Sequence, residues 1–178
     1  MSPNHHLACA CGKTQLTLQG SPITSTECYC DSCRAAGARL AHLPCARPML
    51  DRRGGTRFVL YRKDRVQFTA GADQLKEFRL STGAATRRVV ATCCNTPVFL
   101  EFEGGHWLSL YGGLWPDGTL PLLEMRTMTG DLPDASVLPS DVPNLKRQSG
   151  VFFAKLLKAW IAMGFRSPRI AVGGEIRA

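Results

Sequence analysis

Hydrophobic and polar residues alternate with a period of two along much of the chain up to residue 113. Alternation of this kind predicts β-strands, because successive side chains of a strand point to opposite faces. Glycine pairs close several of the alternating segments and are typical of turns that need a positive φ. The pattern predicts strands over residues 13–20, 57–62, 65–71, 74–81, 87–92, 97–105 and 106–113. Lys63-Asp64 lies between the second and third of these and predicts a hairpin there.

The composition changes at about Gly130. Residues 130–145 contain three prolines, which indicates an extended linker. Apolar residues then recur at helical spacing, and the spacing predicts an amphipathic helix that Ser149 caps and Gly164 ends. We therefore expect a β domain over residues 1–130 and, over residues 131–178, a proline-rich linker with a helix that packs on that domain.

Charge and hydropathy narrow the class of protein. The net charge is +8, but the 22 basic residues are scattered, which favours a basic soluble surface over a nucleic-acid interface. The opening "MSPNHHLACACGK" lacks the apolar stretch of a secretory signal. Lys155 and Lys158 interrupt the longest apolar run, which is too short to span a bilayer. We expect a cytoplasmic protein, although the basic residues of the helix also permit peripheral contact with an anionic membrane.

Eight cysteines are the main candidates for chemistry. A reducing cytoplasm disfavours a disulfide framework, so metal binding or thiol chemistry is the better interpretation. Cys45 stands alone and receives no role. The other seven form three groups: "CAC" (Cys9, Cys11), "CYCDSC" (Cys28, Cys30, Cys33) and "CC" (Cys93, Cys94).

The "CYCDSC" group is the strongest local signal. Three thiolates within six residues can surround a zinc ion if the chain turns tightly, and Asp31 and Ser32 favour a turn. Structural zinc sites use four protein ligands, so three leave one position for a thiol or water. The alternative is that a fourth ligand from elsewhere closes the site. His42 and His106 are possible ligands, but a single histidine is more often structural.

The ordered motifs CxCGK, CxCxxCR and CCNTP resemble the glutathione-dependent formaldehyde-activating enzyme family, also called the CENP-V/GFA-like group, over about residues 7–112. The resemblance is closest to an uncharacterised, divergent branch. It implies a mainly β, Mss4-like fold of small antiparallel sheets pinned by zinc, with the C-terminal helix as an extension. Tyr29, Ala91 and Asn95 depart from the family pattern, and residues 130–178 have no counterpart in its short members.

The resemblance also implies the metal ligands, for one or two Zn²⁺ ions. A structural set would comprise Cys9, Cys11 and Cys94, with Ala91 at the position of the fourth ligand. Neighbouring side chains of a strand point to opposite faces, but Asn95 tolerates the left-handed conformation that would turn the chain. Cys93 is then the natural substitute for the missing ligand. Alternatively, Cys93 points towards the Cys28 group, or the site is lost and the thiols are free.

The resemblance implies a catalytic set of Cys28, Cys30 and Cys33, in a carbon–sulfur lyase of the S-(hydroxymethyl)glutathione synthase type. A thiol, with glutathione as the candidate, would join formaldehyde or a related aldehyde. Arg34 and Arg88 are candidates to bind the glutathione carboxylates. The expected partners are thus a small thiol or aldehyde, and a homodimer is compatible with the sequence. The alternatives are a non-catalytic, zinc-stabilised scaffold for a protein partner and a zinc module that binds nucleic acid.

Overall fold

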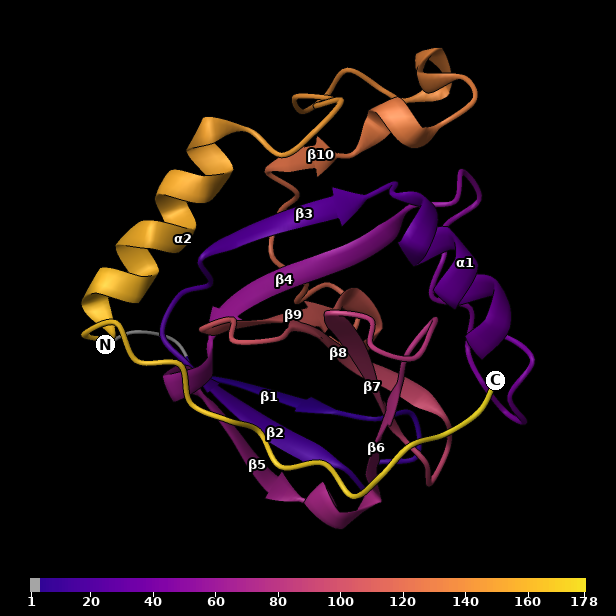
Figure 1. Ribbon diagram of the computed structural model, residues 1–178, viewed down its shortest axis with the longest axis vertical. Coiled ribbons are helices and arrows are strands. Elements are labelled where there is room, and N and C mark those ends of the chain that lie inside the picture. Colours follow the sequence, from indigo (N-terminus) through magenta and orange to yellow (C-terminus); the bar gives the residue numbers. More distant parts are fainter. Residues whose placement is uncertain (1–3) are drawn as a thin grey trace.

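The computed structural model describes residues 4–178, which form two β-sheets and two α-helices (Figure 1). The larger sheet has the order β10 (Met125–Thr127), β3 (Thr24–Cys28), β4 (Thr56–Arg62), β9 (Trp107–Tyr111), β8 (Thr96–Phe102), β7 (Thr86–Ala91) and β6 (Leu75–Phe78). The smaller sheet has the order β1 (Asn4–Ala8), β2 (Gln15–Gln19) and β5 (Val66–Ala70). The helices are α1 (Asp31–Leu40) and α2 (Gly150–Ala162). The mainly β class predicted from the alternation is confirmed.

The two sheets share one hydrophobic core. Leu7, Leu16 and Leu18 of the small sheet join this core with Val89 and Phe99 of the large one. Each such side chain contributes about 1.5–3 kcal/mol when it is fully buried. Neighbouring strands are antiparallel except for β10 and β3, which pair in parallel. The core therefore fixes the small sheet, and the residues that follow β1, against the large sheet.

The predicted hairpin at Lys63-Asp64 is wrong. Strand β4 belongs to the large sheet and β5 to the small one, so the two strands do not pair. Residues Lys63–Arg65 form a 3-10 turn that carries the chain from one sheet to the other. The Lys63 ammonium is buried against the Glu101 carboxylate, and its backbone N–H donates to His106 O at 3.1 Å. These contacts hold the connection between the two sheets in place, at the position where the alternation alone suggested a hairpin turn.

Helix α1 was not predicted from the sequence, because three of the four residues of its apolar face are small. The face comprises Cys33, Ala36, Gly37 and Leu40, at the spacing of one helix side. Gly37 lies so close to Leu50 that a Cβ atom there would be 2.5 Å from the leucine side chain. The residues interpreted as a tight turn, Asp31 and Ser32, form the first turn of this helix.

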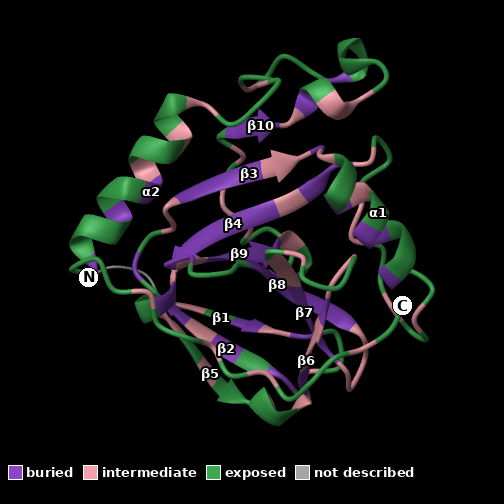
Figure 2. Cartoon of the chain, viewed as in Figure 1, coloured by how far each residue is buried: buried purple, intermediate pink, exposed green. Residues whose placement is uncertain are grey.

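Helix α2 begins as the sequence predicts. The Ser149 hydroxyl accepts the backbone N–H of Phe152 at 3.2 Å and caps the helix. Leu156 is buried beside Phe58 and Leu100 of the large sheet, while the outer side of the helix is exposed (Figure 2). The His106 ring, just before β9, bonds to Leu156 O at 2.9 Å.

The C-terminal tail lies along the edge strand β6. Gly173 N–H donates to Leu75 O at 2.9 Å, and Ile176 N–H donates to Glu77 O at 2.8 Å. The tail therefore covers backbone groups that an edge strand would otherwise leave unpaired. Within residues 4–178, no helix combines the length and the apolar character needed to cross a membrane.

Candidate metal centres

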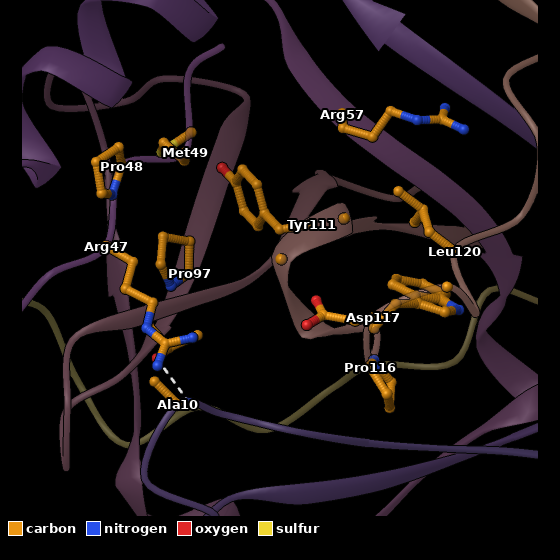
Figure 3. A pocket seen from close by; sticks show the side chains of 15 residues that line it. Ala10, Arg47, Pro48, Met49, Arg57, Pro97, Tyr111, Pro116, Asp117 and Leu120 are labelled. Carbon is orange, nitrogen blue, oxygen red and sulfur yellow. Dashed lines mark hydrogen bonds between the residues drawn. The ribbon is translucent and has the colours of Figure 1, made fainter.

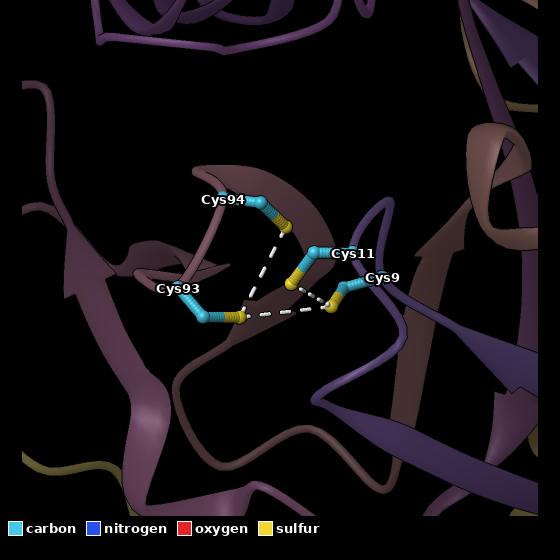
Figure 4. Close-up of side chains that lie close together, drawn as sticks. All are labelled: Cys9, Cys11, Cys93 and Cys94. Atoms are coloured by element: carbon cyan, nitrogen blue, oxygen red, sulfur yellow. Dashed lines mark hydrogen bonds between the residues drawn. The ribbon is translucent and has the colours of Figure 1, made fainter.

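Cys9, Cys11, Cys93 and Cys94 lie together, with all four Sγ atoms within 4.8 Å of one another (Figure 4). The first two follow β1 and the last two lie in the turn between β7 and β8. The Sγ of Cys9 is 3.6 Å from those of Cys11 and Cys93, and the Cys93 and Cys94 Sγ atoms are 3.9 Å apart. A tetrahedron with Zn–S bonds of about 2.3 Å has sulfur atoms about 3.8 Å apart. These three separations match that value, and the four thiols are close enough to share one zinc ion.

A tight turn lets the adjacent Cys93 and Cys94 contribute to the same cluster. Asn95 has φ 53°, the left-handed conformation that the sequence suggested for it, and its side-chain amide donates to Pro44 O at 2.9 Å. The Cys94 N–H bonds to Ala91 O at 3.3 Å. Ala91 itself is fully buried in the hydrophobic core. The cluster thus contains Cys93, whereas Ala91 is directed into the core.

The surroundings of this cluster favour the thiolate form of Cys9 and the neutral thiol of Cys93. Burial raises the pKa of the Cys9 thiol, but hydrogen bonds, above all from the Thr14 N–H at 3.3 Å, outweigh it and lower the pKa to about 6. Burial raises the pKa of the Cys93 thiol to about 12. Four sulfurs this close cannot all ionise unless a bound cation offsets much of their charge. A divalent ion would meet that requirement.

The second cluster comprises Cys28, Cys30 and Cys33, whose Sγ atoms also lie within 4.8 Å of one another. Cys28 ends strand β3, Cys30 caps helix α1, and Cys33 lies in its first turn. The Cys30 Sγ accepts the Cys33 backbone N–H at 3.4 Å. A helix N-terminus carries a partial positive charge and stabilises an anion such as a thiolate. The strand–helix junction therefore supplies both the spacing and the favourable field.

The three thiols of this cluster titrate very differently. Hydrogen bonds from Cys28 and Cys33 lower the pKa of the Cys30 thiol to about 2. The bond to Cys30 raises the pKa of the Cys28 thiol to about 11, and bonds to both neighbours raise the pKa of Cys33. One thiolate is thus held by two thiol donors. As in the first cluster, ionisation of all three requires a cation.

A cavity of about 770 Å³ adjoins the three-cysteine cluster. All three cysteines and Ser32 line one part of it. Other walls come from the large sheet, from the loop between β8 and β9 and from α2, and most of their side chains are apolar. Those from α2 are Phe152, Phe153, Leu156, Leu157 and Trp160. The volume falls within the range of small-molecule sites.

Residues 4–48 match the family described as "Glutathione-dependent formaldehyde-activating enzyme" (GFA). This segment carries the CxCGK and CxCxxCR motifs that suggested the resemblance. Over these residues the chain is similar to the GFA family. The matched segment includes the whole three-cysteine cluster and ends before Cys93 and Cys94. The assignment of the late cysteines to the same site therefore depends on the geometry of the four-cysteine cluster.

Comparisons with solved structures and with curated proteins gave the following results. The chain is similar to a solved crystal structure of a Rhodobacter sphaeroides protein, with 14% sequence identity and a TM-score of 0.46. The similarity covers 79% of this chain and 99% of that one. No curated protein matches the chain.

Arg34 and Arg88, the candidate glutathione ligands, are not among the residues that line the cavity beside the three-cysteine cluster. Arg34 bonds to the Asp31 carboxylate and donates to Asp131 O at 2.8 Å. Arg88 is fully buried and donates from Nη2 to Ser32 O at 3.0 Å. Within residues 4–178, its Nε and Nη1 have no hydrogen-bond partner and it forms no ion pair. A guanidinium is thus buried directly behind the three-cysteine cluster.

The two histidines weighed as ligands lie outside both clusters. His42 is exposed, and His106 is buried, stacked on Trp160 with ring centroids 5.5 Å apart. Burial lowers the pKa of His106. The structural interpretation of this histidine therefore agrees with its contacts.

A second, smaller cavity of about 430 Å³ is lined by an entirely different set of residues (Figure 3). Arg47, Arg57, Tyr111 and Asp117 are among the residues that line it. The Arg57 guanidinium is hydrogen-bonded within the protein, because it donates to Thr26 O at 3.1 Å and to Pro121 O at 2.6 Å. The local patterns of the sequence signalled neither cavity, since each is assembled from segments far apart in the chain.

Proposed function

We propose that this GFA-like chain binds two zinc ions and that a thiol and an aldehyde join at the three-cysteine centre. The observation that carries the proposal is the contrast between the two clusters. One provides four sulfurs within 4.8 Å of one another, the number that a structural zinc site uses. The other provides three sulfurs and faces a cavity large enough for a small molecule.

The residues around the second centre fit a zinc ion. Three thiolates and one divalent cation together carry one net negative charge. Arg88, buried beside Ser32 without a carboxylate partner among residues 4–178, supplies the compensating positive charge. A buried guanidinium without an anion would otherwise be costly. A zinc ion bound there would act as a Lewis acid with one position for an exogenous ligand.

The proposed reaction adds a thiol to an aldehyde without oxidation or reduction. The sulfur forms a bond to the carbonyl carbon, the C=O π electrons move to the oxygen, and the S–H proton ends on that oxygen. The product is a thiohemiacetal, and the reverse reaction is a carbon–sulfur lyase reaction. Arg88 would stabilise negative charge near the reacting sulfur, and the apolar walls of the cavity would exclude water, which strengthens that interaction.

Metal content tests the two-centre part of the proposal. We expect two zinc ions per wild-type chain by elemental analysis. Cys30→Ser should lower the content by one ion, because it removes a ligand of the three-cysteine centre. Cys45→Ser is the matched control, since Cys45 is an exposed thiol outside both clusters and its loss should leave the content unchanged. Arg88→Met should weaken zinc binding at the second centre alone.

Adduct formation tests the reaction itself. Proton NMR would follow the appearance of the S-hydroxymethyl adduct after a thiol is mixed with formaldehyde. The wild type should accelerate the reaction, and Cys30→Ser should not. A protein with both zinc ions bound that accelerates the reaction no more than Cys30→Ser would contradict the enzyme proposal. It would favour the non-catalytic scaffold instead.

A further inference from the structure

We propose that the cavity beside the three-cysteine centre selects a thiol or aldehyde that carries an uncharged, apolar chain or ring. The inference rests on the proposed function, because it assumes that the reacting group lies at the cysteines. It goes further in naming the chemical class of the remainder of the ligand, which would lie between helix α2 and the large sheet.

The walls of the cavity carry this inference. Close to the cysteines, Phe58, Leu60 and Leu100 form the sheet side. Opposite them, five large apolar residues of α2 line the cavity: Phe152, Phe153, Leu156, Leu157 and Trp160. Trp107 and Phe102 continue the apolar surface on a further side. A ligand that extends from the thiols into the cavity therefore contacts hydrocarbon on several sides.

Part of this apolar lining is exposed to solvent. Phe153, Leu157 and Phe102 are all more than two-fifths exposed, and each lines the cavity. Exposed apolar side chains gathered around one cavity commonly mark a binding site. An apolar ligand would cover them and gain the free energy of their removal from water.

The charge distribution points the same way. Within residues 4–178, Glu103 is the one side chain of permanent charge that lines the cavity, and it is exposed and negative. Glutathione carries two carboxylates, which need cationic or hydrogen-bonding partners when they leave water. Arg34 and Arg88 lie outside the lining: Arg34 bonds to Asp31 and Asp131, and Arg88 is fully buried and donates to Ser32 O. The uncharged chain or ring of an apolar ligand needs no such partners, so its removal from water carries no desolvation cost of this kind.

Calorimetric titration with two homologous series tests the proposal. The thiols are ethanethiol, butanethiol and hexanethiol, and the alcohols are ethanol, butan-1-ol and hexan-1-ol. Each added methylene should tighten binding about fourfold, so that hexanethiol binds on the order of 10²-fold more tightly than ethanethiol. Trp160 and Trp107 line the cavity, so their fluorescence provides a second readout.

Helix α2 offers a matched pair of variants. Leu157 lines the cavity and is 51% exposed, whereas Ile161, one turn further on, is 55% exposed and lies outside the lining. Both side chains are exposed, so substitution by asparagine should preserve the fold. Leu157→Asn should weaken hexanethiol binding about fivefold and leave ethanethiol binding unchanged. Ile161→Asn should behave as wild type.

The outcomes separate this inference from the proposed function. Chain-length dependence in both series, with each thiol tighter than the alcohol of equal length, supports both. Chain-length dependence without a preference for thiols supports the apolar cavity and contradicts the reactive centre. Affinity that does not depend on chain length, or an equal loss in Leu157→Asn and Ile161→Asn, overturns the inference. Tighter binding of glutathione than of hexanethiol would overturn it as well.

Discussion

Replacement of Cys93 by alanine tests whether the four-cysteine cluster is a zinc site that joins the two sheets. Cys9 and Cys11 follow β1 of the small sheet, and Cys93 lies in the β7–β8 turn of the large sheet. An ion bound by all four thiols would therefore cross-link residues far apart in the sequence. Cys93→Ala removes one ligand and leaves an incomplete set.

The expected loss of stability follows from the geometry of the cluster and from the thermodynamic linkage between zinc binding and folding. The cluster needs little rearrangement to bind zinc, because three of its S–S separations, at 3.6–3.9 Å, match the tetrahedral value of about 3.8 Å and all four Sγ atoms lie within 4.8 Å of one another. A ligand at a thousand times its dissociation constant stabilises the folded chain by about 4 kcal/mol. At this chain length, 1 kcal/mol corresponds to about 2–4 °C in Tm. We therefore expect Cys93→Ala to lower the Tm by about 8–16 °C at that free zinc concentration.

Calorimetric unfolding with and without a chelator is the assay. The wild type and Cys45→Ser should lose stability when zinc is removed, whereas Cys93→Ala should lose only the share that comes from the three-cysteine centre. Elemental analysis should find one fewer zinc ion in Cys93→Ala. If the variant keeps the zinc content and the chelator response of the wild type, Cys93 is not a ligand. The double variant Ala91→Cys/Cys93→Ala should not recover the ion, because residue 91 is buried in the core.

Three further predictions concern the frame around the sites. Ser149→Ala removes the cap of α2 and should cost about 1 kcal/mol in chemical denaturation. Gly71→Ala should cost about 2 kcal/mol or more, because φ is +65° and the new Cβ would lie 2.5 Å from Lys13 O; Gly83→Ala, at φ +78° but in open space, should cost less. Burial lowers the pKa of His106, so the unfolded chain takes up the proton first as pH falls below about 6.5. Stability should then fall by up to about 1.4 kcal/mol per pH unit until the folded pKa is reached. His106→Gln should show a smaller loss of stability between pH 7 and pH 5; an equal loss would show that the pH dependence comes from other groups.

Regular local patterns were the part of the fold that the sequence predicted well. Strands β2, β4, β5, β6, β7, β8 and β9 lie where alternation of apolar and polar residues indicated them. Helix α2 begins after Ser149 because a hydroxyl at that position satisfies a free backbone N–H, which is a local interaction. Local interactions of this kind depend on neighbours in the chain, so the sequence displays them directly.

Elements stabilised by distant contacts were missed. Strand β3, "TSTEC", has few apolar residues, yet Thr24, Ser25 and Thr26 are buried between its neighbours in the sheet. Strand β10 lies beside β3, where Arg126 bonds to Glu27 at 2.9 Å. Neither strand shows an alternating pattern in its own sequence, because hydrogen bonds and ion pairs from other segments compensate the burial of these polar groups.

The sequence by itself determined the chemistry available to this protein: three groups of thiols, of the type and spacing that bind zinc. It also limited Cys93 to a few possible partners. Only the tertiary structure decided that Cys93 and Cys94 meet Cys9 and Cys11, because that meeting depends on the packing of one sheet on another. The same holds for the apolar cavity over the three-cysteine cluster, whose walls include both Cys28 and the distant helix α2. Spacing along a chain sets which ligands a short loop can offer, whereas packing sets which of them share a site.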